Sequence, residues 1–257
     1  MDLSELKRQR SSDLQRHPWE IVRAGIINFL LKKYNSAPGN IADVGSGDTY
    51  VLQHLNLRGI EKRFAVDTGY DDEIVSQLKT NNTGKEIRFL RSKEDLENSR
   101  TPINLFLFLD VLEHCEDDKA VLSSYVRTSA ADDRAAFLIT VPAYQGLWST
   151  HDQLLGHYRR YTRRQLEKLC KEEKLKVIRS GYFFFTLLPA RWMQRMLERS
   201  GLRKPDRSID NWNGSTVVSK LILAILWLDF YIGYGLSKAG IILPGLSCYC
   251  ICQKSPS

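Results

Sequence analysis

The chain has 257 residues and a formal net charge of +7, with 43% hydrophobic and 26% charged residues. This composition excludes collagen-like, low-complexity and wholly disordered proteins, and the length predicts one large domain over residues 1–257. The positive charge favours acidic small molecules or an anionic membrane surface as partners, and the lack of a dense basic block argues against nucleic acid.

Residues 1–16 are polar and lack an apolar central run, so we expect neither a signal peptide nor a transit peptide. Five cysteines, an odd number, argue against a disulfide framework and predict a reducing, cytoplasmic location. Apolar residues at helical spacing predict a helix over residues 17–33, which Pro38 and Gly39 separate from the next element.

From residue 41 to residue 185, short apolar runs alternate with segments of helix length. The predicted strands are residues 41–44, 63–66, 86–90, 103–109, 135–141 and 176–185. The predicted helices are residues 48–58, 71–79, 93–97, 117–128 and 162–173. Strands and helices that take turns predict an α/β fold, in which a parallel sheet has helices on both faces.

Residues 186–240 interrupt this alternation. They contain a predicted helix over residues 191–199 and an apolar run over residues 217–235. The run has nearly the length of a membrane span, but Lys220 and Asp229 lie within it and make a span costly. We therefore expect a helical lid or insertion before a last strand within residues 241–257. It would pack on the domain, lie in a membrane interface or form a dimer interface.

The last predicted strand contains Cys248, Cys250 and Cys252. In an extended strand, neighbouring thiols of this set are expected about 6–7 Å apart on one face. Two thiolates that share one zinc ion must approach within roughly 4 Å. The spacing therefore predicts small buried residues and no metal site.

A glycine turn follows the first predicted strand, with Gly45, Ser46 and Gly47 leading into a helix. Glycine permits a tight turn and the close approach of a ligand, and nucleotide-like ligands bind at this edge of an α/β sheet. Asp67 ends the second strand, where a carboxylate can accept both ribose hydroxyls of an adenosyl group. Tyr50 stands where a dinucleotide fingerprint has its third glycine, which argues against an NAD-dependent oxidoreductase.

The fourth predicted strand ends in the motif Asp110-Val111-Leu112-Glu113-His114. Together with Asp43-x-Gly45-x-Gly47 and the acid Asp67, this motif resembles the class I S-adenosylmethionine-dependent methyltransferases, in particular the small-molecule and quinone-type enzymes of bacteria. The resemblance covers residues 17–185 and resumes at the final strand. It implies a Rossmann-like, seven-stranded sheet of order 3-2-1-4-5-7-6, with strand 7 antiparallel and the helical insertion before it.

The resemblance also implies the cofactor and its contacts. S-adenosylmethionine is expected to bind the turn, the second-strand acid and the fourth-strand motif. The residues concerned are Asp43, Gly45, Ser46, Gly47, Asp67, Asp110 and Val111. Thr49 stands where the class usually has a third glycine. A longer string over residues 141–161, and another over residues 17–23, are similar to one bacterial subgroup.

Methyl transfer needs a general base only if the nucleophile arrives protonated, and imidazole titrates near neutral pH. The candidates for this role are His114, His151 and His157. Arg159 and Arg160 suit an anionic acceptor, because guanidinium groups match phosphate or carboxylate geometry. The alternative is a structured loop in which these arginines bind carbonyl groups and Asp152.

Tyr144 and Trp148 are predicted to line the acceptor pocket, or else to pack in the core. The expected function is methyl transfer to an O, N or C nucleophile of a small acceptor, with anionic and lipid-linked molecules as the leading classes. The expected location is cytoplasmic, with peripheral membrane contact through residues 217–235 as a further possibility. The alternative function is a non-catalytic membrane-surface or regulatory binding protein on the same fold.

Overall fold

The structure is a computed structural model that describes residues 16–34, 39–80, 84–200, 212 and 214–255. Its centre is a seven-stranded sheet of order β3-β2-β1-β4-β5-β7-β6. The strands are β1 Gly39–Val44, β2 Ile60–Val66, β3 Arg88–Leu90, β4 Ile103–Leu109, β5 Ala131–Pro142, β6 Leu175–Phe183 and β7 Ser247–Lys254. β7 runs antiparallel to both β5 and β6, and the other pairs are parallel. The predicted α/β fold, strand order and antiparallel strand are confirmed.

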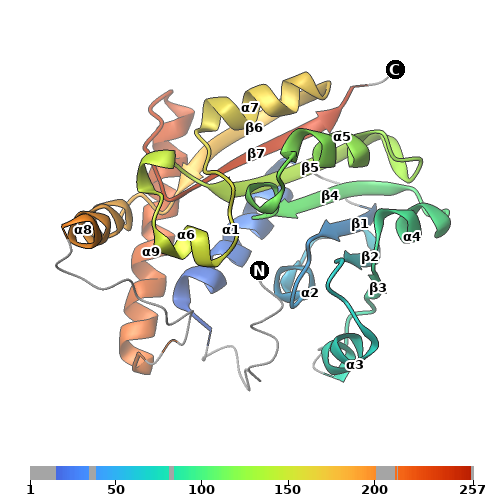
Figure 1. The fold of residues 1–257 in the computed structure, drawn as a ribbon, viewed down its shortest axis with the longest axis horizontal. Helices are drawn as coiled ribbons and strands as arrows, with labels where there is room; N and C mark the ends of the chain where they lie inside the picture. The colour runs from blue at the N-terminus through green and yellow to red at the C-terminus, as the bar shows by residue number, and fades with distance from the viewer. Residues whose placement is uncertain (1–15, 35–38, 81–83, 201–211, 213, 256–257) are drawn as a thin grey trace.

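Helices cover both faces of this sheet (Figure 1). The longer ones are α1 Pro18–Tyr34, α3 Asp72–Thr80, α5 Asp118–Val126, α7 Arg163–Glu172, α8 Leu188–Arg199 and α9 Thr216–Lys238. The shorter ones are α2 Tyr50–His54, α4 Lys93–Asn98 and α6 Thr150–Leu154, with 3-10 turns η3 Leu112–His114 and η4 Gln145–Leu147. Buried side chains of α4, α5 and α7 share one apolar cluster, and those of α1, α2 and α9 share the other.

β4 shows why both clusters form around one strand. Leu105 and Leu107 belong to the α1 and α9 cluster, whereas Phe106 and Phe108 belong to the cluster of α4, α5 and α7. Successive side chains of a strand point to opposite faces, so a continuously apolar strand supplies a core on each side. β4 is therefore the central strand of the sheet, with an apolar cluster on each of its faces.

Several element boundaries differ from the predictions. The helix predicted over residues 48–58 is only α2, because Thr49 before it is left-handed and Leu55 after it is extended. The predicted strands over residues 63–66 and 135–141 are longer in the structure, and the one over 86–90 is shorter. α6, η3 and η4 were not predicted, since three to five residues are too few to show a helical period.

The apolar helix α9 packs along α1. Phe29 makes edge contacts with Phe230 and Tyr234, and the hydroxyls of Tyr34 and Tyr234 lie 3.0 Å apart. A Cβ at Gly25 would lie only 2.4 Å from the Trp227 ring, so glycine allows this close approach. One side of α9 is thus joined to the domain core.

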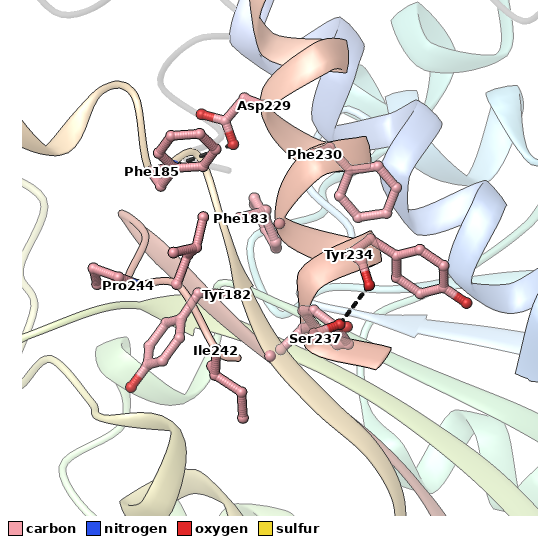
Figure 2. A pocket seen from close by; sticks show the side chains of 13 residues that line it. Tyr182, Phe183, Phe185, Asp229, Phe230, Tyr234, Ser237, Ile242 and Pro244 are labelled. Carbon is pink, nitrogen blue, oxygen red and sulfur yellow. Dashed lines mark hydrogen bonds between the residues drawn. The ribbon is translucent and has the colours of Figure 1, made fainter. Parts of the chain in front are cut away.

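Asp229 is the buried acid within α9, and Figure 2 shows its carboxylate turned toward Phe185. It accepts hydrogen bonds from the backbone N–H groups of Phe185 at 3.2 Å and Thr186 at 2.7 Å. The Thr186 hydroxyl also donates to it at 2.5 Å. Asp229 therefore fixes the connection between β6 and α8 to the middle of α9.

The three cysteines of β7 are fully buried, as predicted. The expected thiol separation was wrong, because the sulfurs of Cys250 and Cys252 lie 3.3 Å apart. Cys170 of α7 lies against this pair, and the sulfurs of Cys170, Cys250 and Cys252 all lie within 4.8 Å of one another. The side chains lean together under α7, so the spacing argument against a shared metal ion does not hold.

Candidate functional site

The glycine turn after β1 lies at the carboxyl edge of the parallel strands. Gly45 and Gly47 have φ angles of 66° and 50°, a region that favours glycine. The N–H of Gly45 donates to the carbonyl of Val66 at 2.8 Å, which ties the turn to the end of β2. A Cβ on Gly45 would lie 2.7 Å from Cγ2 of Val111, so the turn also packs against the residue that follows Asp110.

Asp67 lies beside this turn and faces it. Its Oδ2 accepts from the N–H of Gly47 at 3.0 Å, and its Oδ1 accepts from the N–H of Gly69 at 2.9 Å. A carboxylate has about four acceptor positions, so two of them stay available to donors such as vicinal hydroxyls. The structure therefore brings the predicted turn and the predicted acid together.

Asp43 lies in β1 just before the turn and is 3% exposed. Burial raises the pKa of its carboxyl to about 7, the guanidinium of Arg23 lowers it, and the carboxylates of Asp67 and Asp48 raise it. Its Oδ1 has no hydrogen-bond partner among the described residues. Such an atom is costly when buried, and a positively charged ligand at the turn would offset that cost.

Tyr70 closes the turn from the side of β2 and was not predicted as a site residue. Its hydroxyl donates to the carbonyl of Gly47 at 2.8 Å and lies 2.7 Å from the Ser46 hydroxyl. Burial raises the pKa of Tyr70, so the phenol stays neutral. The sequence could have indicated Tyr70 as a site residue only because it follows Asp67 by three positions.

Asp110 ends β4 with a φ of 58°. Its Oδ2 pairs with the guanidinium of Arg23 at 2.9 Å, and its Oδ1 accepts from the hydroxyl of Thr140 at 2.9 Å. Arg23 reaches it from α1 and is itself buried. Arg23 belongs to the string of residues 17–23 named above, but the distance along the sequence does not predict its contact with Asp110.

The segment after β5 folds back on the sheet edge. The N–H of Tyr161 donates to the carbonyl of Pro142 at 3.0 Å, and the N–H of Tyr158 donates to the carbonyl of Glu113 at 2.7 Å. These bonds bring His157 against His114, with ring centroids 4.6 Å apart. Two of the three predicted histidines thus meet at the end of β4. The third, His151, is half-buried in α6.

Asp152 orients this pair and is fully buried. It accepts from Nδ1 of His157 at 2.9 Å and from Nε of Arg160 at 2.7 Å. Burial raises the pKa of Asp152, but these hydrogen bonds hold it below its usual range, so the acid is an anion. An anionic partner requires the proton on Nδ1 of His157, which leaves Nε2 as an acceptor. The arrangement is that of an oriented general base.

Glu113 adds a second buried acid next to the histidines. It is 1% exposed, and burial together with Asp110 raises its pKa. His114 is exposed on one side, but the partial burial of its ring and the neighbouring His157 lower its pKa to about 4, so His114 is neutral at pH 7. One ligand atom each from Glu113, His114 and His157 lie within 4.8 Å of one another, a set that could hold a divalent cation. The sequence alone predicts no metal site here.

The two predicted arginines both have partners within the protein. Arg159 pairs with Asp118 at 2.8 Å and donates to the carbonyl of Glu116. Arg160 is buried against Asp152 and donates to the carbonyl of Ala143 at 3.2 Å. These are the contacts of the structured-loop alternative, and Arg159 is the more exposed of the two.

Tyr144 and Trp148 lie on either side of η4, and both are half-buried. Tyr144 stacks on Tyr182 with ring centroids 5.3 Å apart. It also lines an open apolar cavity of about 440 Å³ between η4 and α8. The other lining residues are Gly146, Leu147, Leu188, Pro189 and Trp192. This volume falls in the range of small-molecule pockets.

No family model matches the chain, and no curated protein matches it significantly. Solved structures do resemble it. A candidate sarcosine dimethylglycine methyltransferase from Galdieria sulphuraria has a TM-score of 0.54 at 12% identity, covering 92% of this chain and 86% of that one. A chain of the Haloferax volcanii complex between the Trm112 methyltransferase activator and a candidate methyltransferase has a TM-score of 0.53 at 12% identity, covering 89% and 88%.

The plantazolicin methyltransferase BamL, in complex with a triazolic desmethylPZN analogue and S-adenosylhomocysteine, has a TM-score of 0.52 at 15% identity. It covers 98% of this chain and 90% of its own. Similarity at this level of identity shows the fold alone. The chain therefore has the fold of class I S-adenosylmethionine-dependent methyltransferases.

Proposed function

We propose that the protein transfers a methyl group from S-adenosylmethionine to an O, N or C nucleophile of a small acceptor, with anionic and lipid-linked molecules as the leading classes. The observation that carries the proposal is the pairing of the glycine turn with Asp67 at the carboxyl edge of β1 and β2. The fold supports it, because BamL binds S-adenosylhomocysteine on the same fold.

The residues of the turn fit this cofactor. Asp67 has spare acceptor positions for ribose hydroxyls, and the glycines of the turn have no side chain to obstruct a ligand. The unpartnered buried oxygen of Asp43 suits a molecule that carries positive charge. When bound, S-adenosylmethionine supplies an activated methyl group on a sulfonium.

The protein's own task is then to position the acceptor and to remove a proton where the nucleophile carries one. Holding two reactants at attack distance can contribute about 7–11 kcal/mol. We assign the removal of this proton to Nε2 of His157, since Asp152 fixes the tautomer in which Nε2 can accept it. The negative charge of Asp152 stabilises the imidazolium that forms, and neutral His114 lies next to it as a second polar contact.

Tyr144 and the apolar cavity beside it are assigned to the body of the acceptor. Arg159, which is partly exposed, is assigned to an anionic group of the acceptor. Arg160 is assigned to holding Asp152 in place, because its guanidinium is buried against that acid.

The proposal is tested with methyl-labelled S-adenosylmethionine and a cell extract separated into aqueous and lipid fractions. We expect label to enter a small molecule in one fraction, and His157→Ala to reduce this transfer by about 10²–10⁴-fold while cofactor affinity stays unchanged. The Ile178→Ser variant, an exposed change in β6, is the matched control. Cofactor binding without transfer to any fraction would favour the non-catalytic alternative.

A further inference from the structure

α8 and α9 both expose large apolar side chains. α8 also turns polar side chains toward the protein, an inverted pattern compared with an ordinary surface helix. In α8 the exposed large residues are Trp192, Met193 and Met196. Polar residues lie on the inner side, where Arg191 donates to the Ser149 hydroxyl at 2.7 Å. Within α8, Arg191 also donates to Gln194 at 3.0 Å. Exposure of these apolar side chains to water is unfavourable, so we expect another surface to cover them.

α9 exposes an apolar side over a greater length, although its inner side, with Leu226, Phe230 and Tyr234, is apolar too. Its exposed side carries large apolar residues, among them Val217 at 76% and Leu228 at 61% exposed, while the acid Asp229 is buried. The outward set is Val217, Val218, Leu221, Ile225, Leu228, Tyr231 and Ile232. The helix is long and apolar enough to cross a membrane, and only 22% of its most apolar window is buried.

The contacts of α9 make a lengthwise position in the interface a better account than a span. Phe230 and Tyr234 pack on Phe29 of α1, and Asp229 binds the connection to α8. A span would have to break these contacts and carry the Asp229 carboxylate into hydrocarbon. One side of the helix belongs to the domain core, so only the other side is available to lipid.

The charges around α9 favour an anionic lipid bilayer over a second copy of the chain as the partner that covers its apolar side. Within α9 the exposed charged residues are Lys220, in the first two turns, and Lys238, at the last residue. Lysines near the two ends of an apolar face can reach phosphate groups while the face between them meets acyl chains. The chain's net charge of +7 adds attraction to anionic headgroups and opposes pairing with a second copy of itself.

The two helices are connected structurally. α8 begins two residues after Thr186, whose N–H and hydroxyl bind Asp229 in the middle of α9. Both helices appear on the left of Figure 1. The apolar cavity lined by Tyr144 and Trp192 opens between η4 and α8, so a molecule leaving the bilayer at α8 would meet it.

From these observations we infer that the outward sides of α8 and α9 form a face that docks on an anionic lipid bilayer. This membrane-docking face consists of Trp192, Met193 and Met196 on α8 and the outward set of α9 named above. The inference does not depend on methyl transfer, since it rests on the helices alone.

Co-sedimentation with vesicles tests the inference. Vesicles of phosphatidylcholine mixed with phosphatidylglycerol should bind the protein, and binding should weaken as salt rises. The triple change Leu221→Ser, Ile225→Ser and Leu228→Ser should reduce the partition coefficient by about tenfold or more, because it removes apolar surface from the face. Ile178→Ser, an exposed change outside the face, should leave binding unchanged.

Two further measurements keep the result interpretable. Emission of Trp192, identified by difference with Trp192→Phe, should shift to the blue and be quenched by brominated lipid. Unfolding by denaturant should show that the triple variant is folded, as removal of exposed apolar groups predicts. The inference is overturned if no vesicle binds, or if the protein is a dimer that the triple variant converts to a monomer without any change in lipid binding.

Discussion

At the scale of single residues, Asp43 couples the glycine turn to pH. Burial raises its folded pKa to about 7, above its ordinary value near 3.8. The unfolded chain therefore loses this proton at lower pH than the folded protein does. The free energy of unfolding should fall as pH rises between about 4 and 7, and the loss should persist above pH 7.

Asp43→Asn removes this dependence, because the amide stays neutral. Relative to wild type, the variant should gain stability between pH 5 and pH 8, by at most about 4 kcal/mol. Its affinity for a cationic cofactor should fall, since the anion beneath the turn is lost. Denaturant unfolding at both pH values checks the first effect. An equal difference between the two proteins at pH 5 and pH 8 would contradict it.

His114 provides a second titration. Burial and His157 lower its pKa to about 4, so its ring should remain neutral between pH 5 and pH 8. Replacing His157 by alanine removes a neighbouring positive charge at low pH and opens the site, so the midpoint should rise toward 6.5. The imidazole proton shifts, followed by NMR as the pH is changed, give the His114 midpoint in the wild type and in His157→Ala. A wild-type midpoint near 6.5 would show that His114 does not sit in this environment.

Gly45 allows the turn to approach Val111. Gly45→Ala puts a Cβ about 2.7 Å from Cγ2 of Val111, at a backbone φ of 66° that side chains disfavour. We expect a stability loss of about 1–3 kcal/mol. Adding Val111→Ala should recover the steric part of this loss but not the backbone part. Thermal unfolding of the two single variants and the double variant tests this. Strictly additive losses would exclude the contact as the cause.

At the scale of elements, Asp229 joins α9 to the start of α8. Asp229→Ala leaves the N–H groups of Phe185 and Thr186 without their acceptor, and because both bonds are only partly buried we expect a total loss of about 1–3 kcal/mol. Hydrogen exchange should speed up at these amides and along α8. The matched control is Asp71→Ala, which removes an exposed cap from α3 and should cost about 1 kcal/mol. Similar losses in both variants would mean that the connection is not held by Asp229.

The sequence predicted the elements that obey a clear periodicity. Alternating apolar strands and helices defined the α/β sheet, and the resemblance supplied the strand order. The short elements α6, η3 and η4 were not predicted because they are too short to show a helical period, and α6 begins at a capping box of Ser149 and Asp152. The inverted pattern of α8 was also missed, since a hydrophobic period does not reveal which side faces the protein.

At the scale of the whole molecule, the strand ends define the site, and this part could be predicted. Gly45, Gly47 and Asp67 follow consecutive strands, and parallel strands bring their carboxyl ends together. The contacts that cross the fold could not be predicted. Arg23 reaches Asp110 from α1, and Asp152 meets His157 only because the chain folds back after β5. The site depends on these contacts as much as on the motifs.

The division of the chain into a core over residues 17–185, an insertion over 186–240 and a last strand remains a prediction. The two apolar clusters, one on each face, include side chains from both the core and the final strand. The insertion contributes Leu226, Phe230 and Tyr234 to the cluster around α1. Removing residues 186–240 should therefore destabilise the sheet, which proteolysis of the shortened chain would reveal.

The central claim is that the turn between β1 and α2 binds S-adenosylmethionine with the help of Asp67. Calorimetric titration of the purified protein with S-adenosylmethionine and S-adenosylhomocysteine tests it most directly, beside Asp67→Ala and the control Asp133→Ala at an exposed position. We expect both ligands to bind wild type and the control alike, and Asp67→Ala to lose about 1–3 kcal/mol of binding free energy while remaining folded. Absence of binding to the folded wild type, or equal affinity in Asp67→Ala, would contradict the account.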